Sequence, residues 1–169
     1  MASHTSSDKL AQDTAEFHGA LTSLIRVYQF RDRDRICCHD LSVTQWYALD
    51  SLVSGGPFTL NELAGELYLE KSTMSRVVDG LERKGYVVRN RHPDDGRAVL
   101  LEVNSKGLEI HRKIEEEILA GEERLLGGFD PEVRRAMVEF LRRLTDAAAS
   151  RVEVRGGTCC SRGPYAGVP

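Results

Sequence analysis

The sequence predicts a mostly α-helical fold with one small β-hairpin. Apolar residues recur with helical spacing in residues 8–36 and again in residues 105–151. Between these segments the pattern changes to that of strands in residues 86–90 and 97–103, which flank a polar RHPDDG turn. The chain has 169 residues, which is enough for one domain with an extension.

Three short helices are predicted ahead of the hairpin, in residues 42–56, 59–69 and 70–85. The first two open with Ser or Thr followed three residues later by Gln or Glu, the pattern of a capping box. The third ends at Gly85, where a glycine closes many helices. These signals separate the three helices from one another.

The C-terminal part predicts two further helices and a tail. Asn104 and Ser105 are good N-cap residues for the first of these helices, and Asp130 with Pro131 marks the start of the second. Residues 152–169 carry no helical spacing and predict a flexible tail that contains cysteines. The predicted inner face of the last helix consists of Val133, Met137, Phe140, Leu141 and Leu144.

Three short helices followed by a hairpin is the plan of a winged helix–turn–helix domain, predicted here for residues 41–104. The long helical segments 8–36 and 105–151 are more apolar than a single strip of core requires. We therefore expect these two segments to form a dimerisation region that packs on a second copy of the chain.

The third short helix presents polar and basic side chains that can approach base edges and phosphates. From Lys71 to Arg97 the chain has seven Lys or Arg and four Asp or Glu, although its net charge is −3. A basic surface on an acidic chain favours binding to double-stranded DNA. The candidate DNA-binding residues of this helix are Lys71, Ser72, Thr73, Ser75 and Arg76.

Three stretches together resemble the MarR family of bacterial transcription regulators in order and spacing. They are LSVTQWYALDSL, TLNELAGELYLEKSTMSRVVDGLERKGYVVR and HPDDGRAVLLEVNSKG. The resemblance covers roughly residues 10–150, and it is most specific from Leu60 to Gly107. It implies a homodimer, joined by the first and the last two helices, that binds a pseudo-palindromic operator.

The wing of that family carries an Asp-x-Arg element, which falls here on Asp95, Gly96 and Arg97. The resemblance implies that Arg97 enters the minor groove and that Asp95 holds it in position. Gly96 stands where relatives often have a basic residue, which predicts a weaker grip on phosphate at the wing tip. Arg91, on the other side of the turn, is a further candidate DNA contact.

Other function classes are less well supported. The sequence has no Gly-rich phosphate loop, no His-Glu-x-x-His motif and no nucleophile elbow, so we do not expect an enzyme. A winged-helix module that only dimerises and binds no DNA is the alternative class, and it predicts no salt-dependent affinity for DNA. Trp46 and Tyr47 are expected in the core rather than around a ligand.

The four cysteines form two adjacent pairs, Cys37-Cys38 and Cys159-Cys160. Adjacent cysteines rarely bond to each other, but they present two soft thiolates that suit Zn(II), Cu(I), Hg(II) or trivalent arsenic. In ligand chemistry alone the pairs resemble the sensing sites of arsenic-responsive repressors of the ArsR family. The favoured hypothesis is a repressor that requires no cofactor and is released from DNA by a soft metal ion or metalloid bound by these cysteines.

Three other readings of the cysteines and the effector remain open. A disulfide formed between the two pairs would make them a thiol redox switch. A small aromatic ligand, as the resemblance implies, would need no cysteine. For Cys37 and Cys38 the structural alternative is burial as small apolar residues.

The N-terminal sequence predicts a cytoplasmic protein. MASHTSSDKLAQDTAEF lacks the apolar core of a secretion signal, and no apolar run is long enough to span a membrane. We therefore expect no membrane partner and a reducing environment for the thiols.

Overall fold

The computed structural model describes residues 2–91 and 98–150, without the side chains of residues 2–7 and 32. The predicted wing residues Asp95 and Arg97 and the predicted tail with Cys159 and Cys160 lie outside these described residues. The chain divides into two compact units, Met1–Val43 and Thr44–Pro169.

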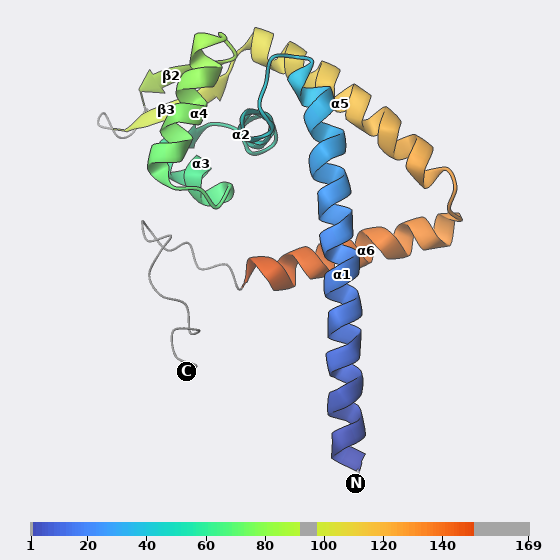
Figure 1. Ribbon diagram of the computed structural model, residues 1–169. Coiled ribbons are helices and arrows are strands. Elements are labelled where there is room, and N and C mark those ends of the chain that lie inside the picture. Colours follow the sequence, from blue (N-terminus) through green and yellow to red (C-terminus); the bar gives the residue numbers. More distant parts are fainter. Residues whose placement is uncertain (1, 92–97, 151–169) are drawn as a thin grey trace. The chain divides into compact units, whose positions relative to one another are not determined.

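The first unit contains the long helix α1 (Ala2–Cys37) (Figure 1). It includes the predicted span 8–36 and begins earlier, because residues 2–7 contain neither proline nor glycine. Apolar residues along α1 are largely exposed, with 68% of Leu10, 41% of Phe17 and 46% of Leu24 accessible. This stripe has no packing partner among the described residues of its own unit.

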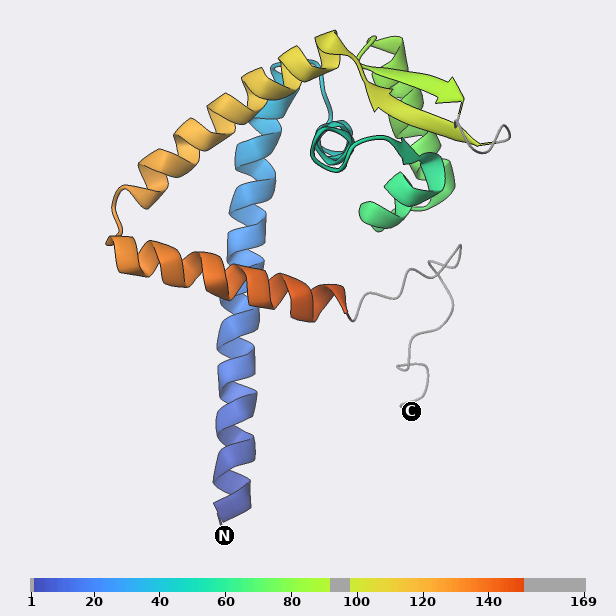
Figure 2. The same cartoon turned by 180° about the vertical axis from the view of Figure 1, so that it is seen from behind.

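The second unit has the element order of a winged helix–turn–helix domain followed by two long helices, so the predicted fold class is confirmed (Figure 1). Figure 2 shows from behind that the hairpin of β2 and β3 lies beside α4, in agreement with Figure 1. The elements are α2 (Val43–Gly55), β1 (Phe58–Thr59), α3 (Leu60–Glu66), α4 (Lys71–Arg83), β2 (Val87–Arg91), β3 (Val99–Val103), α5 (Ser105–Leu126) and α6 (Pro131–Ala149).

Local hydrogen bonds explain where α3 and α4 begin and end. Thr59 and Glu62 form the predicted capping box at the start of α3. The chain leaves α3 at Tyr68, whose φ of 52° lies in the left-handed region, so this helix is shorter than predicted. Gly85 has a φ of 72° after α4, and the Tyr86 N–H donates to the Leu81 carbonyl at 3.0 Å, which closes a Schellman motif.

The sheet has three antiparallel strands in the order β1-β3-β2 rather than the two strands of the predicted hairpin. Strand β1 pairs Phe58 with Leu101, and β2 pairs Val87 with Val103. A two-residue strand directly before a helix has too few residues to show the alternation by which strands are recognised. The extra strand places the start of α3 at the edge of the sheet.

The core of the second unit lies between α2, α3, α4, the sheet and the first half of α5. Trp46 is 6% exposed, as predicted for a core residue, but Tyr47 is 49% exposed. The prediction for Tyr47 is wrong, because its side chain lies on the exposed side of α2, whereas Trp46, Ala48 and Leu49 form the buried side. The core includes Leu49, Leu52, Leu63, Met74, Val78, Leu81, Val87, Leu101 and Ile114.

Helix α5 starts in direct contact with the end of α4. The Asn104 side chain accepts a hydrogen bond from the Gly107 N–H at 3.0 Å and donates one to the Gly85 carbonyl at 2.9 Å. A Cβ atom on Gly107 would lie 2.3 Å from the Tyr86 carbonyl oxygen. Gly107 therefore allows an approach between α5 and the α4–β2 junction that a larger residue would prevent.

Helix α6 begins after Asp130 with Pro131, as predicted, and has no buried residue. The expectation that its apolar face points inward is wrong within one chain, because 44% of Val133, 55% of Phe140 and 47% of Leu141 are exposed. Within the described part of the chain, no helix is long and apolar enough to cross a membrane.

Candidate nucleic-acid interface

The first turn of α4 is an exposed polar surface. Lys71, Ser72 and Thr73 are exposed, Ser75 is half-buried and Arg76 is exposed. Glu70, the N-cap residue, makes no side-chain capping hydrogen bond. Hydroxyl groups and a guanidinium at the start of a helix can reach base edges in a major groove, as proposed from the sequence.

The opposite face of α4 is fixed in the core. Met74, Val78 and Leu81 have no exposed surface. On its α2 side the helix packs closely, since a Cβ atom on Gly80 would lie 2.3 Å from Gln45 Nε2. Lys84 Nζ, just beyond the helix, donates to Gln45 Oε1 at 3.0 Å. The exposed face of α4 is thus carried by a helix that cannot roll without breaking core contacts.

Arg89 joins the sheet to α4 and was not singled out by the sequence. Its Nη2 lies 2.5 Å from Asp79 Oδ1 and its Nε lies 2.9 Å from Glu82 Oε2. Both carboxylates belong to α4, whereas Arg89 belongs to β2. The guanidinium is therefore engaged within the protein, and charge-assisted hydrogen bonds of this kind hold a defined geometry.

Arg91 leaves β2 on the same side as Arg89, because side chains alternate along a strand and the two are separated by one residue. Arg91 is exposed. It makes no ion pair with another described residue. It therefore extends the cationic surface from α4 toward the wing.

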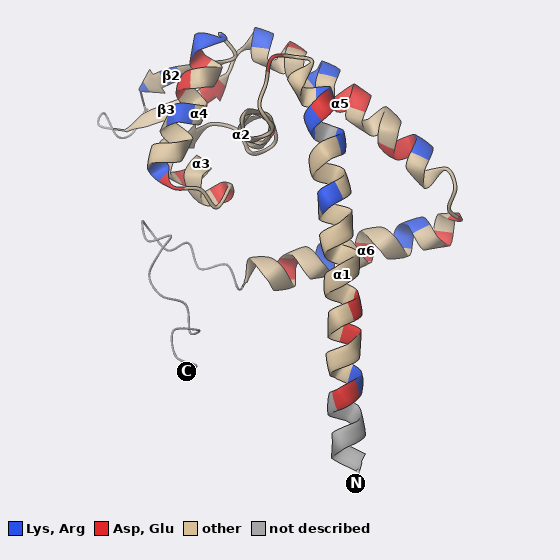
Figure 3. Cartoon of the chain, in the orientation of Figure 1, with Lys and Arg blue, Asp and Glu red and all other residues tan. Residues whose placement is uncertain are grey.

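The described part of this surface, residues 71–91, is basic. Residues 71–91 contain six Lys or Arg and two Asp or Glu. The two acids, Asp79 and Glu82, are the partners of Arg89. Figure 3 shows the Lys and Arg residues of α4 and β2 in blue. Within this described stretch, every carboxylate is paired with a cation, and most of the cations are left for an anionic ligand.

Of the four predicted metal ligands, only Cys37 and Cys38 belong to the described residues. Cys37 and Cys38 are both exposed, so they are not buried as small apolar residues within one chain. Cys159 and Cys160 lie outside the described residues. Among the described residues, no group of three or more His, Cys, Asp or Glu side chains is arranged to hold a metal ion.

Comparison with known proteins agrees with the fold. The sequence model of the MarR family matches residues 39–98. The HTH-type transcriptional regulator Mb0904 of Mycobacterium bovis is 30% identical over 142 residues, which span 82% of this chain and 96% of the relative. The regulator YxaD of Bacillus subtilis is 28% identical over 127 residues, which span 75% of this chain and 89% of the relative.

Two solved structures are similar along most of their length. A MarR family protein from Bacillus stearothermophilus has a TM-score of 0.74 at 26% identity, over 81% of this chain and 96% of the other. FabT of Streptococcus pneumoniae, solved in complex with DNA, has a TM-score of 0.72 at 24% identity, over 81% of this chain and 98% of the other. The second comparison shows the fold alone.

The matched proteins are transcriptional regulators with the fold described above, in agreement with the expectation that the chain is not an enzyme. The chain belongs to the MarR family and is a DNA-binding transcriptional regulator.

Proposed function

We propose that this protein is a homodimeric repressor that binds a pseudo-palindromic operator with α4 in the major groove. The observation that carries the proposal is the exposed first turn of α4, whose opposite face is buried in the core. Beside it, Lys71, Arg76 and Arg91 make no ion pair with a carboxylate of the described residues. Ser72, Thr73, Ser75 and Arg76 supply the contacts to base edges and neighbouring phosphates.

The wing completes this interface in the proposal. Arg91 contacts the DNA backbone at the base of the wing, and Arg97 enters the minor groove with Asp95 holding it in place. The support for Arg91 is its exposure beside Arg89. The support for Asp95 and Arg97 is the family pattern of the sequence alone. Replacing Arg97 with Ala is expected to weaken operator binding by about 1–3 kcal/mol and to reduce the salt slope by about one.

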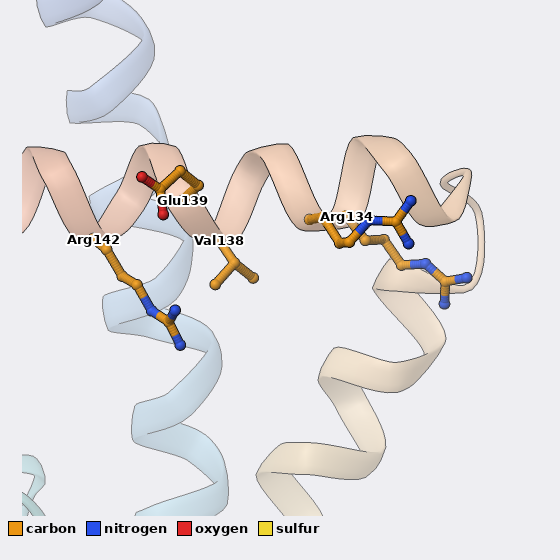
Figure 4. A pocket seen from close by; sticks show the side chains of 5 residues that line it. Arg134, Val138, Glu139 and Arg142 are labelled. Carbon is orange, nitrogen blue, oxygen red and sulfur yellow. The ribbon is translucent and has the colours of Figure 1, made fainter.

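The exposed apolar faces of α1, α5 and α6 support a homodimer. Large apolar side chains remain exposed on each helix, including Phe30 on α1, Leu119 on α5 and Phe140 on α6. A hollow of about 390 Å³ follows α6 between Val138 and its polar neighbours Arg134, Arg135, Glu139 and Arg142 (Figure 4). Apolar faces of this extent on a regulator indicate a protein interface. We propose that residues 8–36 and 105–151 form the dimerisation region and residues 41–104 the DNA-binding domain.

Sedimentation tests the dimer. The protein is expected to sediment as a dimer at micromolar concentration, because a two-fold dimer is needed to match a pseudo-palindromic site. A monomer that binds a single half-site with full affinity would contradict this part of the proposal.

The favoured effector is a soft metal ion or a trivalent metalloid bound by cysteine thiolates. Two exposed neighbouring thiols, Cys37 and Cys38, support the proposal. In the proposed site, Cys159 and Cys160 supply further thiolates beside this pair. A thiol redox switch through the same cysteines is the second candidate, and a small aromatic effector is the third. In each case the protein is cytoplasmic and needs no cofactor to bind DNA.

The effector is tested on the reduced protein–operator complex. Arsenite, Zn(II), Cu(I) and Hg(II) are added separately, and release of DNA is followed by fluorescence anisotropy. The metal hypothesis expects release by at least one ion, and loss of the response in the Cys159→Ser/Cys160→Ser variant. Release by peroxide alone would favour the redox switch, and a full response of the Ser variant would remove the tail from the sensor.

The experiment that tests the proposed function is the salt dependence of duplex binding. Affinity is expected to fall linearly on a logarithmic plot against salt, because bound cations displace counterions from DNA. The direction of control is read from transcription in vitro, where a repressor lowers the transcript from its operator. Salt-independent or absent DNA binding would favour the alternative of a winged-helix module that only dimerises.

A further inference from the structure

A polar cleft lies beside the first turn of α4, where α3 begins at the edge of the sheet. Its volume is about 430 Å³. It opens between four segments: the β1–α3 junction, the start of α4, the middle of β2 and the start of β3. The lining side chains that matter for its chemistry are Thr59, Asn61, Lys71, Arg89, Ala98 and Val99. Of these, only Lys71 belongs to the DNA-binding residues proposed from the sequence.

The charge of the cleft suits an anion. Lys71 and Arg89 line it, and no carboxylate does so among the described lining residues. The nearby carboxylate of Glu62 is turned back onto the Thr59 N–H, which donates to Glu62 Oε2 at 2.8 Å. The capping box that starts α3 therefore engages this carboxylate with the backbone, and Glu62 is not among the described lining residues of the cleft.

The two cations of the cleft have different roles. Arg89 is engaged by Asp79 and Glu82, so it fixes the wall of the cleft and brings little net charge. The Lys71 side chain is exposed and makes no hydrogen bond or ion pair with the other described residues. The Asn61 side chain is likewise exposed, without a hydrogen-bond partner among the described residues. An ammonium group and an amide N–H₂ group thus line one cleft, and both have donors to offer.

We propose that this cleft seats one phosphate of the operator backbone, held by Lys71 Nζ and Asn61 Nδ2. The inference rests on the proposed function and assigns a specific part of the DNA to a specific part of the protein. Lys and Asn are among the side chains that contact phosphate in protein–DNA complexes, and such contacts set the register of a protein on the duplex. Ala98 and Val99 leave apolar space for the adjoining sugar.

Continuity with α4 selects the DNA backbone over a free anion as the occupant. Lys71 is the first residue of α4, directly before the exposed Ser72 and Thr73. A backbone phosphate in the cleft would place the next stretch of duplex against those two hydroxyl groups. Asn61 and Lys71 then both contact phosphate rather than a base, and this contact sets the register in which α4 meets the bases.

The substitutions Lys71→Ala and Asn61→Ala separate charge from hydrogen bonding. Both variants are expected to lose roughly tenfold in affinity, equally for operator and unrelated duplex, because a phosphate carries no sequence information. Lys71→Ala should also reduce the salt slope by about one, whereas Asn61→Ala should leave the slope unchanged, since an amide displaces no counterion. Lys113→Ala, which removes an exposed cation of α5, is the matched control and should keep wild-type affinity and slope.

A scan with neutral phosphates locates the contact. Single methylphosphonates are placed along the operator, and binding of wild type, Lys71→Ala and Asn61→Ala is compared at each position. The proposal expects one phosphate in each half-site whose neutralisation weakens wild type but has little further effect on either variant. If no position shows this coupling while wild type binds with normal salt dependence, the cleft is not a phosphate seat.

The source of the phosphate and the proposed function are tested separately. Inorganic phosphate is titrated without DNA, and the Asn61 side-chain amide is followed by NMR. Saturation at low millimolar phosphate, together with no coupling in the scan, would assign the cleft to a free anion and overturn the proposal. If wild type binds no duplex in a salt-dependent manner, the proposed function itself fails, irrespective of the variants.

Discussion

His111 of α5 is joined to Asp50 of α2 by a hydrogen bond of 2.8 Å between Nε2 and Oδ1. His111 is 5% exposed, and its imidazole stacks on the Trp46 ring, with 4.8 Å between the ring centroids. Its other nitrogen, Nδ1, lies 3.8 Å from Glu115 Oε2. This half-buried polar contact links α5, the helix that leaves the DNA-binding domain, to α2, the first helix of that domain, so it helps to set their angle.

Asp50 and His111 are expected to contribute to stability as a pair. Asp50→Ala and His111→Ala should each lower the free energy of unfolding by about 1–3 kcal/mol, because a buried polar group loses its partner or its packing. The double variant should lose less than the sum by at least about 0.5 kcal/mol. Urea unfolding at one fixed protein concentration measures this, and Glu116→Ala is an exposed control on the same helix. Strictly additive losses would show that the two side chains do not interact.

Arg89 and Arg91 provide a matched pair two residues apart on β2. Arg89→Ala should lower the free energy of unfolding by about 1 kcal/mol, since it removes the link to Asp79 and Glu82. Arg91→Ala should leave stability within about 0.5 kcal/mol and reduce the salt slope of DNA binding by about one. Thermal unfolding and anisotropy titrations distinguish the two roles. A stability loss for Arg91→Ala together with a reduced salt slope for Arg89→Ala would mean that Arg91 makes the structural contact and Arg89 the DNA contact.

Gly107 is expected to tolerate no side chain. A Cβ atom there would lie 2.3 Å from the Tyr86 carbonyl oxygen and 2.6 Å from Val103 Cγ1. Gly107→Ala should therefore destabilise the protein by about 1–3 kcal/mol through overpacking. Gly65→Ala is the control, because nothing lies within 4 Å of a Cβ atom at that position of α3. Equal stability of the two variants would contradict the close approach of α5 to the sheet.

Asn104 carries two separable interactions. Asn104→Asp keeps the acceptor that caps α5 but loses the donor to the Gly85 carbonyl, whereas Asn104→Ala loses both. We expect Asn104→Ala to cost about 1–2 kcal/mol of stability and Asn104→Asp distinctly less. Chemical denaturation of the two variants gives the order. Asn104→Asp as unstable as Asn104→Ala would show that the bond to Gly85 matters more than the cap.

Much of the fold could be predicted because its signals are local. Thr59 and Glu62 form their capping box within four residues, and Gly85 ends α4 by its own backbone conformation. Strand β1 was not predicted, because its two residues form a strand only through their pairing with β3, which is distant in sequence. Tyr47 was misplaced because the periodicity of α2 is weak and neighbouring aromatic residues do not reveal which one faces the core.

The interface was predicted less completely, since it depends on contacts distant in sequence. The exposed residues of α4 follow from helical periodicity, but the engagement of Arg89 requires that β2 lie against α4. Asn61 carries no sequence signal, because a single asparagine near a helix start is ordinary. It gains its proposed role only from the cleft that it shares with Lys71. A count of charges along the sequence cannot distinguish an unpaired cation such as Lys71 from one that is paired with carboxylates, such as Arg89.

Selection from a pool of random duplex DNA tests the central claim, sequence-specific binding by a dimer, most directly. The wild-type protein is expected to enrich one pseudo-palindromic sequence whose half-sites lie about one helical turn, or a multiple of it, apart. Two subunits should bind each enriched site, and Arg76→Ala should retain binding to unrelated duplex while losing the enrichment. A pool that stays random after selection, although the protein is folded and dimeric, would contradict the account.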